Sequence, residues 1–180
     1  MSASSITRRQ FNRLLASGLM AGSAGVIGQT VQAQQQLPGN RHPVQLKVAA
    51  IQMLPTLGDV FSNMNQAEQL ILKAIQQGAE WIILPEMFTS AVAFHDSMLK
   101  AIQPLDGPPL QLLKKLAYKN NVVIGGSFLA ARSQQVFNTF VLVFPDGTMF
   151  QHDKDMPTYW ENCYYQGGND DGVLSTPIGP

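Results

Sequence analysis

The chain has 180 residues, and its 12 basic and 12 acidic side chains balance to a formal net charge of zero. This length leaves room for about one domain beside an N-terminal targeting segment, and the lack of any basic run argues against a nucleic-acid-binding protein. The single cysteine excludes an intramolecular disulfide, so a disulfide-stabilised scaffold is not expected.

Residues 1–33 are typical of a twin-arginine (Tat) export signal. Arg8 and Arg9 precede a Gly- and Ala-rich apolar stretch, and Val31-Gln32-Ala33 is a small-residue cleavage site. A membrane anchor is the alternative, but glycine and serine interrupt a stretch that is short for a span. We therefore expect export to the periplasm and no stable membrane span after processing. Removal of the signal, which holds three arginines and no acid, changes the formal net charge from 0 to −3.

The first half of the remaining chain reads as a strand, a helix and a second strand. Residues 34–43 are polar and form a flexible leader. Residues 44–53 alternate and then run apolar, which predicts a strand buried on both faces. Apolar side chains recur at helical spacing over 60–78, a segment that ends at a glycine and is typical of an amphipathic helix. Residues 81–84 predict the next strand, with Glu86 just beyond its end.

The second half continues with one more helix and a hairpin. A turn at 104–109 precedes the helix, and a strand at 122–124 is expected to end at the glycine pair that follows it. Two further strands, at 136–144 and 149–152, flank a tight turn. Alternating strands and helices followed by a hairpin predict a layered α/β domain with a mixed sheet over residues 44–180.

Two charged residues carry the strongest chemical signal. Glu86 ends the run Ile82-Ile83-Leu84-Pro85, and Lys154 follows the predicted hairpin. If the fold brings them together, the carboxylate can act as a general base and the ammonium can stabilise an oxyanion. A third group is then needed, because neither is a good nucleophile towards a nitrile or amide at neutral pH. Spacing alone also allows the alternative of a solvated strand-end acid and a hairpin-tip cation.

A series of motifs in this chain resembles the nitrilase (carbon–nitrogen hydrolase) superfamily in content and order. The resemblance covers nearly all of residues 44–180 and implies an α-β-β-α sandwich, incomplete at its C-terminus, with a Glu-Lys-Cys triad. The matching motifs are Leu46-Lys47-Val48-Ala49-Ala50-Ile51-Gln52-Met53, Trp81-Ile82-Ile83-Leu84-Pro85-Glu86-Met87-Phe88, Asp106-Gly107-Pro108, Val123-Ile124-Gly125-Gly126-Ser127, Phe137-Asn138-Thr139, Pro145-Asp146-Gly147 and His152-Asp153-Lys154.

The resemblance assigns roles residue by residue. Glu86 matches the general base and Lys154 the oxyanion-stabilising lysine. Glu161 resembles a further acid that orients the lysine or the substrate, although a surface-loop acid is an equal alternative. Cys163 does not match the nucleophile, because it precedes the Thr-Pro-Ile-Gly stretch at 176–179 and lacks an acidic residue after its aromatic neighbour. The resemblance therefore implies that the chain stops before its nucleophile.

These assignments predict a carbon–nitrogen hydrolase-type protein that hydrolyses a nitrile or a linear amide but is inactive as this fragment. The alternatives are a non-catalytic remnant that binds a small ligand and a folding fragment without activity. No cofactor is expected, and the three histidines show no metal-ligand spacing. A sheet left partly uncovered predicts association into homo-oligomers or poor solubility.

Overall fold

A computed structural model describes residues 45–176 of the chain and shows a six-stranded mixed sheet with helices. The expected export signal at 1–33 and leader at 34–43 lie outside the described residues. The elements are β1 (Val48–Ala50), α2 (Val60–Gln76), β2 (Trp81–Ile83), α3 (Ser97–Lys100), β3 (Gln103–Pro104), α4 (Pro108–Asn120), β4 (Val123–Arg132), β5 (Gln135–Val143), β6 (Met149–Asp153) and the 3₁₀ helix η1 (Glu161–Cys163). The predicted α/β class is confirmed.

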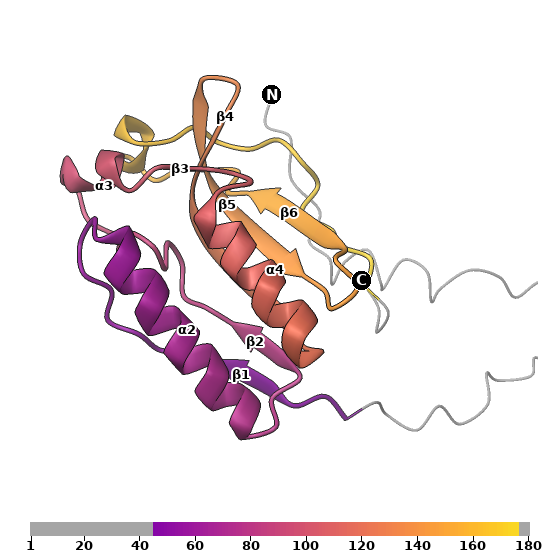
Figure 1. Cartoon of the computed structure of the whole chain (residues 1–180). Coiled ribbons are helices and arrows are strands. Elements are labelled where there is room, and N and C mark those ends of the chain that lie inside the picture. The colour runs from indigo at the N-terminus through magenta and orange to yellow at the C-terminus, as the bar shows by residue number, and fades with distance from the viewer. Residues whose placement is uncertain (1–44, 177–180) are drawn as a thin grey trace, which may run out of the picture. The chain divides into compact units, whose positions relative to one another are not determined.

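The sheet has a parallel half and an antiparallel half. Its main order is β1-β2-β4-β5-β6, and β3 pairs with β4 outside this path. Strands β1, β2 and β4 are parallel and are connected through α2 and α4, whereas β4, β5 and β6 are antiparallel and follow one another through tight turns. Figure 1 shows α2 and α4 lying along the same face of the sheet.

Both long helices lie where the sequence predicts them, over 60–78 and after the turn at 104–109. The Asp59 side chain caps α2 by accepting a hydrogen bond of 3.0 Å from Ser62 N, and Gly78 (φ +82°) takes the left-handed conformation just after the helix. Prolines occupy the first turn of α4, and Asn121 (φ +53°) ends it in the left-handed region.

A continuous hydrophobic core lies between these two helices and the sheet. Alternation along each strand sends every second side chain into it, so Phe128 of β4 and Val141 of β5 are fully buried there. Each such side chain stabilises the fold by about 1.5–3 kcal/mol relative to exposure. The other core residues include Ala67, Ile71, Ala74, Ile82, Leu84, Phe88, Leu113, Leu116, Ala117, Ile124 and Val143.

The prediction that the glycine pair ends the third strand is wrong, because β4 runs through both glycines to Arg132. A Cβ on Gly125 would lie 2.7 Å from the Phe140 ring, and one on Gly126 would lie 3.0 Å from Leu84 Cβ. The glycines therefore permit close packing on both faces of a continuing strand.

The first strand also differs from its prediction, since β1 is not buried on both faces. Among the described residues it pairs only with β2, so it lies at the sheet edge, and Val48 is 55% exposed. An edge strand without a covering layer keeps an accessible face whatever its hydrophobicity.

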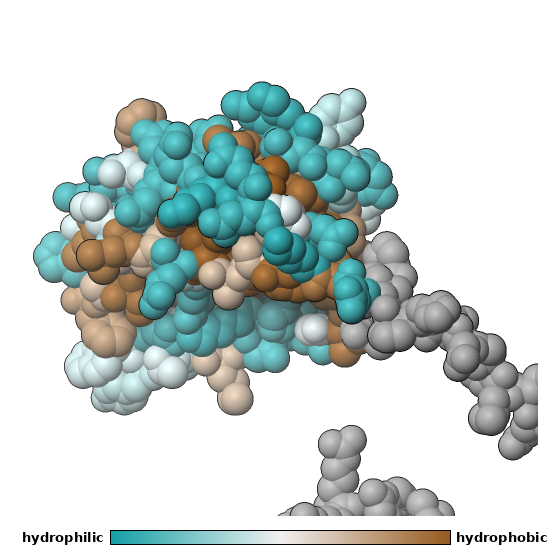
Figure 2. Space-filling view, turned by 90° about the horizontal axis from the view of Figure 1, so that it is seen from below, coloured by the Kyte–Doolittle hydropathy of each residue, from teal (hydrophilic) through white to brown (hydrophobic). Residues whose placement is uncertain are grey.

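The face of the sheet that the helices do not cover carries a smaller apolar cluster. Val123, Leu142 and Phe144 are buried there, with Trp81, Phe140 and other side chains only partly covered. The described residues thus supply one helical and one sheet layer of the expected α-β-β-α sandwich. Figure 2 shows apolar residues gathered in a band between hydrophilic margins on one side of the molecule, so hydrophobic surface is exposed.

Candidate active site

Glu86 is held just beyond the carboxyl end of β2 by bonds on the residues that follow it. Met87 N donates to Ser127 Oγ at 2.9 Å, and Phe88 N donates to Ser127 O at 3.0 Å. These bonds continue the connection to β4 after β2 has ended. Met87 takes a left-handed conformation (φ +50°), which is strained for a residue with a side chain. This turn leaves the half-exposed Glu86 side chain free to face away from the core.

Lys154 directly follows β6 and is tied to its neighbours through its backbone. Its N–H donates to Asn138 O at 3.0 Å, which extends the pairing of β5 with β6 by one residue, and its carbonyl accepts from Gly168 N at 3.0 Å. The turn of this hairpin lies at the opposite end of β6. Lys154 is therefore not the hairpin-tip cation of the alternative reading.

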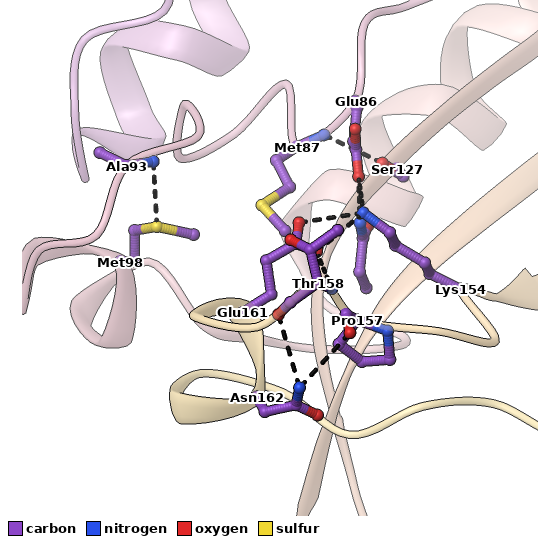
Figure 3. Close-up of polar contacts among 11 residues, drawn as sticks. Glu86, Met87, Ala93, Met98, Ser127, Lys154, Pro157, Thr158, Glu161 and Asn162 are labelled. Carbon is purple, nitrogen blue, oxygen red and sulfur yellow. Dashed lines mark hydrogen bonds and ion pairs between the residues drawn. The ribbon is translucent and has the colours of Figure 1, made fainter.

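The side chains of Glu86, Lys154 and Glu161 converge at one place. Lys154 Nζ lies 3.2 Å from Glu86 Oε1 and 2.9 and 3.0 Å from the two oxygens of Glu161. Figure 3 shows the ammonium between the two carboxylates. The side chains of Glu86, Lys154 and Glu161 are 50%, 31% and 8% exposed. Exposure to solvent therefore decreases from Glu86 through Lys154 to Glu161. The expected convergence of Glu86 and Lys154 is confirmed, although they are 68 residues apart.

Glu161 is a buried residue of η1 and not a surface-loop acid. Its Oε2 accepts hydrogen bonds from Thr158 N at 2.5 Å and Thr158 Oγ1 at 2.6 Å, in addition to the contacts with Lys154. Burial alone would raise the pKa of this carboxyl, but the Thr158 bonds, the nearby Tyr165 hydroxyl and Lys154 outweigh burial and lower the pKa to about 2. Glu161 is thus a fixed anion.

Lys154 is correspondingly a fixed cation. Burial would lower its pKa, yet the hydrogen bonds to Glu161 and Glu86 raise the pKa well above the ordinary lysine value. An amine that keeps its proton at all physiological pH values cannot serve as a base. It can stabilise negative charge that develops on a bound molecule.

Asn138 and Tyr165 complete the polar cluster. The sequence assigned Asn138 no individual role and offered Tyr165 only as an aromatic that lines a pocket or packs in the core. Asn138 Nδ2 donates to Glu86 Oε1 at 2.7 Å. The Tyr165 hydroxyl is buried near Glu161 and Asn138 without a hydrogen bond of normal geometry to either, and burial followed by Glu161 raises its pKa to about 12. The available signal for Asn138 was an amide within a mostly apolar strand.

A cavity of about 310 Å³ opens beside the cluster, a volume suited to a small molecule. Among the described residues, no group of three or more His, Cys, Asp or Glu side chains is arranged to hold a metal ion. The cavity lining combines three charged side chains with polar and apolar ones, namely Leu84, Glu86, Ser127, Asn138, Phe140, His152, Lys154 and Asp155.

Cys163 does not line this cavity. It is an exposed free thiol at the end of η1, whereas Glu161 two residues earlier is buried. Side chains two positions apart on a 3₁₀ turn leave the backbone in different directions. The geometry therefore gives Cys163 no contact with Glu86 or Lys154.

The structure is an α/β domain with an ionic cluster beside a small cavity, and comparison with known proteins identifies its family. Residues 47–180 match the family model described as carbon-nitrogen hydrolase, so the chain belongs to the carbon–nitrogen hydrolase family.

The chain is also similar to curated proteins. A nitrilase of Pyrococcus abyssi is 28% identical over 127 residues, which cover 69% of this chain and 48% of that protein. An N-carbamoylputrescine amidase of Solanum lycopersicum is 30% identical over 131 residues, covering 68% of this chain and 43% of that protein. The chain thus spans about half the length of the curated relatives it matches.

Solved structures support the same fold. The CN-hydrolase superfamily protein XC1258 of Xanthomonas campestris superposes with a TM-score of 0.63 at 24% identity, covering 69% of this chain and 47% of that one. In the described part of this chain, no helix has the length and apolar character needed to cross a membrane.

Proposed function

We propose that this chain carries the Glu and Lys components of a Glu-Lys-Cys active site that hydrolyses a nitrile or a linear amide. The observation that supports this most strongly is the placement of Glu86 and Lys154 at 3.2 Å beside one cavity, with Glu161 holding the lysine from the other side. A general base and an oxyanion-stabilising cation that act on one substrate need this proximity.

In the proposed reaction on an amide, the Glu86 carboxylate takes the proton of a cysteine thiol, and the thiolate attacks the amide carbon. Lys154 Nζ donates a hydrogen bond to the oxygen that becomes negative. The C–N bond then breaks, the proton held by Glu86 passes to the departing nitrogen, and ammonia or an amine leaves. Glu86 next removes a proton from water, which hydrolyses the thioester and restores the thiol.

The thiol for this reaction is proposed to lie outside these 180 residues. Cys163 is exposed and absent from the cavity lining, which supports the interpretation that it is not the nucleophile. The chain by itself is then inactive, since the remaining groups polarise and position a substrate but form no covalent intermediate. If no nucleophile can be supplied, the proposal reduces to the alternative of a small-ligand-binding protein.

Ammonia release tests both parts of this proposal. The 180-residue chain and its Cys163→Ser variant are compared on a short nitrile, a linear amide and an N-carbamoyl amine. We expect no release above background from either protein. Release that disappears in Cys163→Ser would contradict the assignment of the nucleophile.

A chimera supplies the missing part. Residues 44–180 are fused to the segment of the Pyrococcus abyssi nitrilase that follows its matched region, and folding is verified by cooperative thermal unfolding. We expect ammonia release that Glu86→Gln and Lys154→Met each reduce by at least about 100-fold, as general-base and oxyanion groups do. The exposed Lys115→Met serves as the matched control. A folded chimera whose activity survives Glu86→Gln would exclude the assigned base.

We further propose that residues 1–33 direct export through the twin-arginine pathway to the periplasm, as the Arg8-Arg9 pair indicates. Replacing both arginines by lysine should retain the precursor in the cytoplasm, as fractionation and immunoblotting would detect. A processed periplasmic form that persists in this variant would contradict the proposal.

A further inference from the structure

Asn138 is the one residue of the described chain that contacts Glu86 through its side chain and Lys154 through its backbone. Its Nδ2 donates to Glu86 Oε1 at 2.7 Å, and its carbonyl accepts from Lys154 N at 3.0 Å. The residue is only 3% exposed and lies opposite Leu129 in the centre of the β4–β5 pairing. A buried amide at such a position requires a partner, and Glu86 provides one.

The chemistry of the contact determines which way the amide faces. A carboxylate oxygen only accepts hydrogen bonds, so the NH₂ group and not the carbonyl of the amide must point at Glu86. This orientation leaves Asn138 Oδ1 buried without a hydrogen-bond partner, next to the buried hydroxyl of Tyr165.

The two oxygens of Glu86 are therefore unequal. Oε1 accepts hydrogen bonds from both Asn138 and Lys154, whereas no donor among the described residues bonds Oε2, on a half-exposed side chain beside the cavity. The ion pair with Lys154 would not hold this carboxylate by itself. Water screens a partly exposed pair and leaves it weak, and Lys154 makes shorter contacts with Glu161 than with Glu86.

We propose that Asn138 is a positioning residue for the base: it immobilises the Glu86 carboxylate through Oε1 and leaves Oε2 as the oxygen that accepts the proton. Through its carbonyl it also fixes where Lys154 emerges from β6, so one residue of β5 sets the distance between base and cation. This inference rests on the proposed function, because it takes Glu86 to be the general base. The contacts of Asn138 with Glu86 and Lys154 do not depend on turnover.

Replacement of Asn138 by leucine tests the inference without an activity assay. Asn138→Leu keeps a similar volume and the backbone bond to Lys154 but removes the amide donor. The chain has four glutamates, so side-chain carboxyl ¹³C signals can be resolved, and Glu86→Gln assigns one of them. We expect the Glu86 signal to move to the value of a free glutamate and the Lys154 pKa to fall, because the carboxylate swings into water.

A second buried asparagine provides the matched control. Asn63 is 2% exposed and donates through Nδ2 to Thr56 O and Thr89 O, and neither hydrogen bond involves Glu86 or Lys154. Asn63→Leu should lower the melting temperature at least as much as Asn138→Leu and leave the Glu86 and Lys154 signals unchanged. A merely structural role for Asn138 predicts the same spectra for both variants.

An isosteric variant keeps the test decisive if Asn138→Leu fails to fold. In Asn138→Asp the introduced carboxylate repels Glu86 at pH 8, and Glu86 should be displaced as in the leucine variant. At a lower pH, where the two carboxyls share one proton, the introduced carboxyl can donate it to the Glu86 carboxylate, so the Glu86 signal should approach that of the wild type at the same pH. Signals for Glu86 and Lys154 that match the wild type at pH 8 would overturn the inference.

The two proposals fail separately. Unchanged spectra in the Asn138 variants would contradict the positioning role and leave the hydrolase proposal standing. The chimera with its native Asn138 could instead fold but be inactive, while its Asn138 variants show a displaced Glu86 side chain. That result would support the positioning role and contradict the hydrolase proposal.

Discussion

The two faces of the central sheet are built from the same strands yet serve different purposes. On the helix-covered face, Phe128 and Val141 belong to a core whose members are almost fully buried. On the opposite face, their strand neighbours Ser127 and Phe140 line the cavity beside Glu86. Because side chains alternate along β4 and β5, those on one face stabilise the fold and those on the other face line the candidate site. A substitution should consequently act according to the face that it reaches.

The largest difference is expected for two phenylalanines on opposite faces. Phe128 is fully buried and makes an edge contact with Phe88, so Phe128→Ala should lower the free energy of unfolding by about 3–5 kcal/mol. Phe140 is only partly covered, and Phe140→Ala should lower it by less than about 2 kcal/mol because less apolar area is lost. Urea denaturation measures both. Equal losses would show that the open face is as tightly covered as the helix face.

Glu161 tests whether the polar cluster on the open face also contributes to stability. Glu161→Gln should lower the free energy of unfolding by about 1–3 kcal/mol, since a buried charge partner of Lys154 is lost. The pKa of Glu161 falls from its ordinary value of 4.5 to about 2, so its ionised form stabilises the fold above pH 4.5 and this contribution disappears as the pH falls towards 2.

The measurement for Glu161 is a series of urea denaturation curves between pH 6 and pH 2. Glu161→Gln should flatten the acid part of the wild-type profile. The exposed Glu80→Gln is the control for general loss of negative charge. A variant profile as steep as that of the wild type would contradict the role of Glu161.

The adjacent glycines of β4 allow a closer comparison of the two sheet faces. Gly126 faces the helix-covered core, and Gly125 faces the open side. A Cβ on Gly126 would lie 3.0 Å from Leu84 Cβ, an atom fixed to the backbone, so Gly126→Ala should destabilise by about 1–2 kcal/mol. A Cβ on Gly125 would chiefly meet the tip of the partly covered Phe140 ring, which can move, so Gly125→Ala should cost less than about 1 kcal/mol. Melting temperatures of the two variants give the order directly, and the reverse order would show that the open face is the more rigid one.

The same glycines show where prediction from sequence succeeds and where it stops. Periodicity and end signals were sufficient for α2, α4 and the β5–β6 hairpin, because these depend on local pattern. Glycine is also a local breaker signal, and it misled the prediction for β4 because packing against Leu84 and Phe140 keeps the strand extended.

In the candidate site, too, some residues could be predicted from the sequence and others could not. The resemblance supplied Glu86, Lys154 and Glu161, and the structure brings all three together. The hydrogen bond from Asn138 to Glu86 joins residues 52 positions apart, and no local pattern encodes such a contact. The turn between β4 and β5 was missed for a local reason, since Ser133 and Gln134 take positive φ values that usually require glycine or asparagine.

The smallest expected effect concerns a pair at the margin of the open face. His152 lines the cavity and its Nδ1 pairs with Asp170, whose other oxygen accepts from Asp153 N at 3.2 Å. The hydrogen bond to Asp170 raises the pKa of His152 against the opposing effect of burial. Both side chains are partly exposed, so we expect the pair to contribute less than about 1 kcal/mol.

The sign of this effect follows from the raised pKa of His152. The protonated ring stabilises the folded chain fully below pH 6.5, the ordinary histidine value, and the contribution is lost as the pH rises through the higher value of the folded state. His152→Gln should therefore lower the free energy of unfolding at pH 5.5 and leave it nearly unchanged at pH 9. The exposed His95→Gln, whose ring bonds Ser97, is the control. A loss that is equal at both pH values would mean that His152 acts by packing against Gly172 and not by its charge, and the margin of the open face would then be held by shape alone.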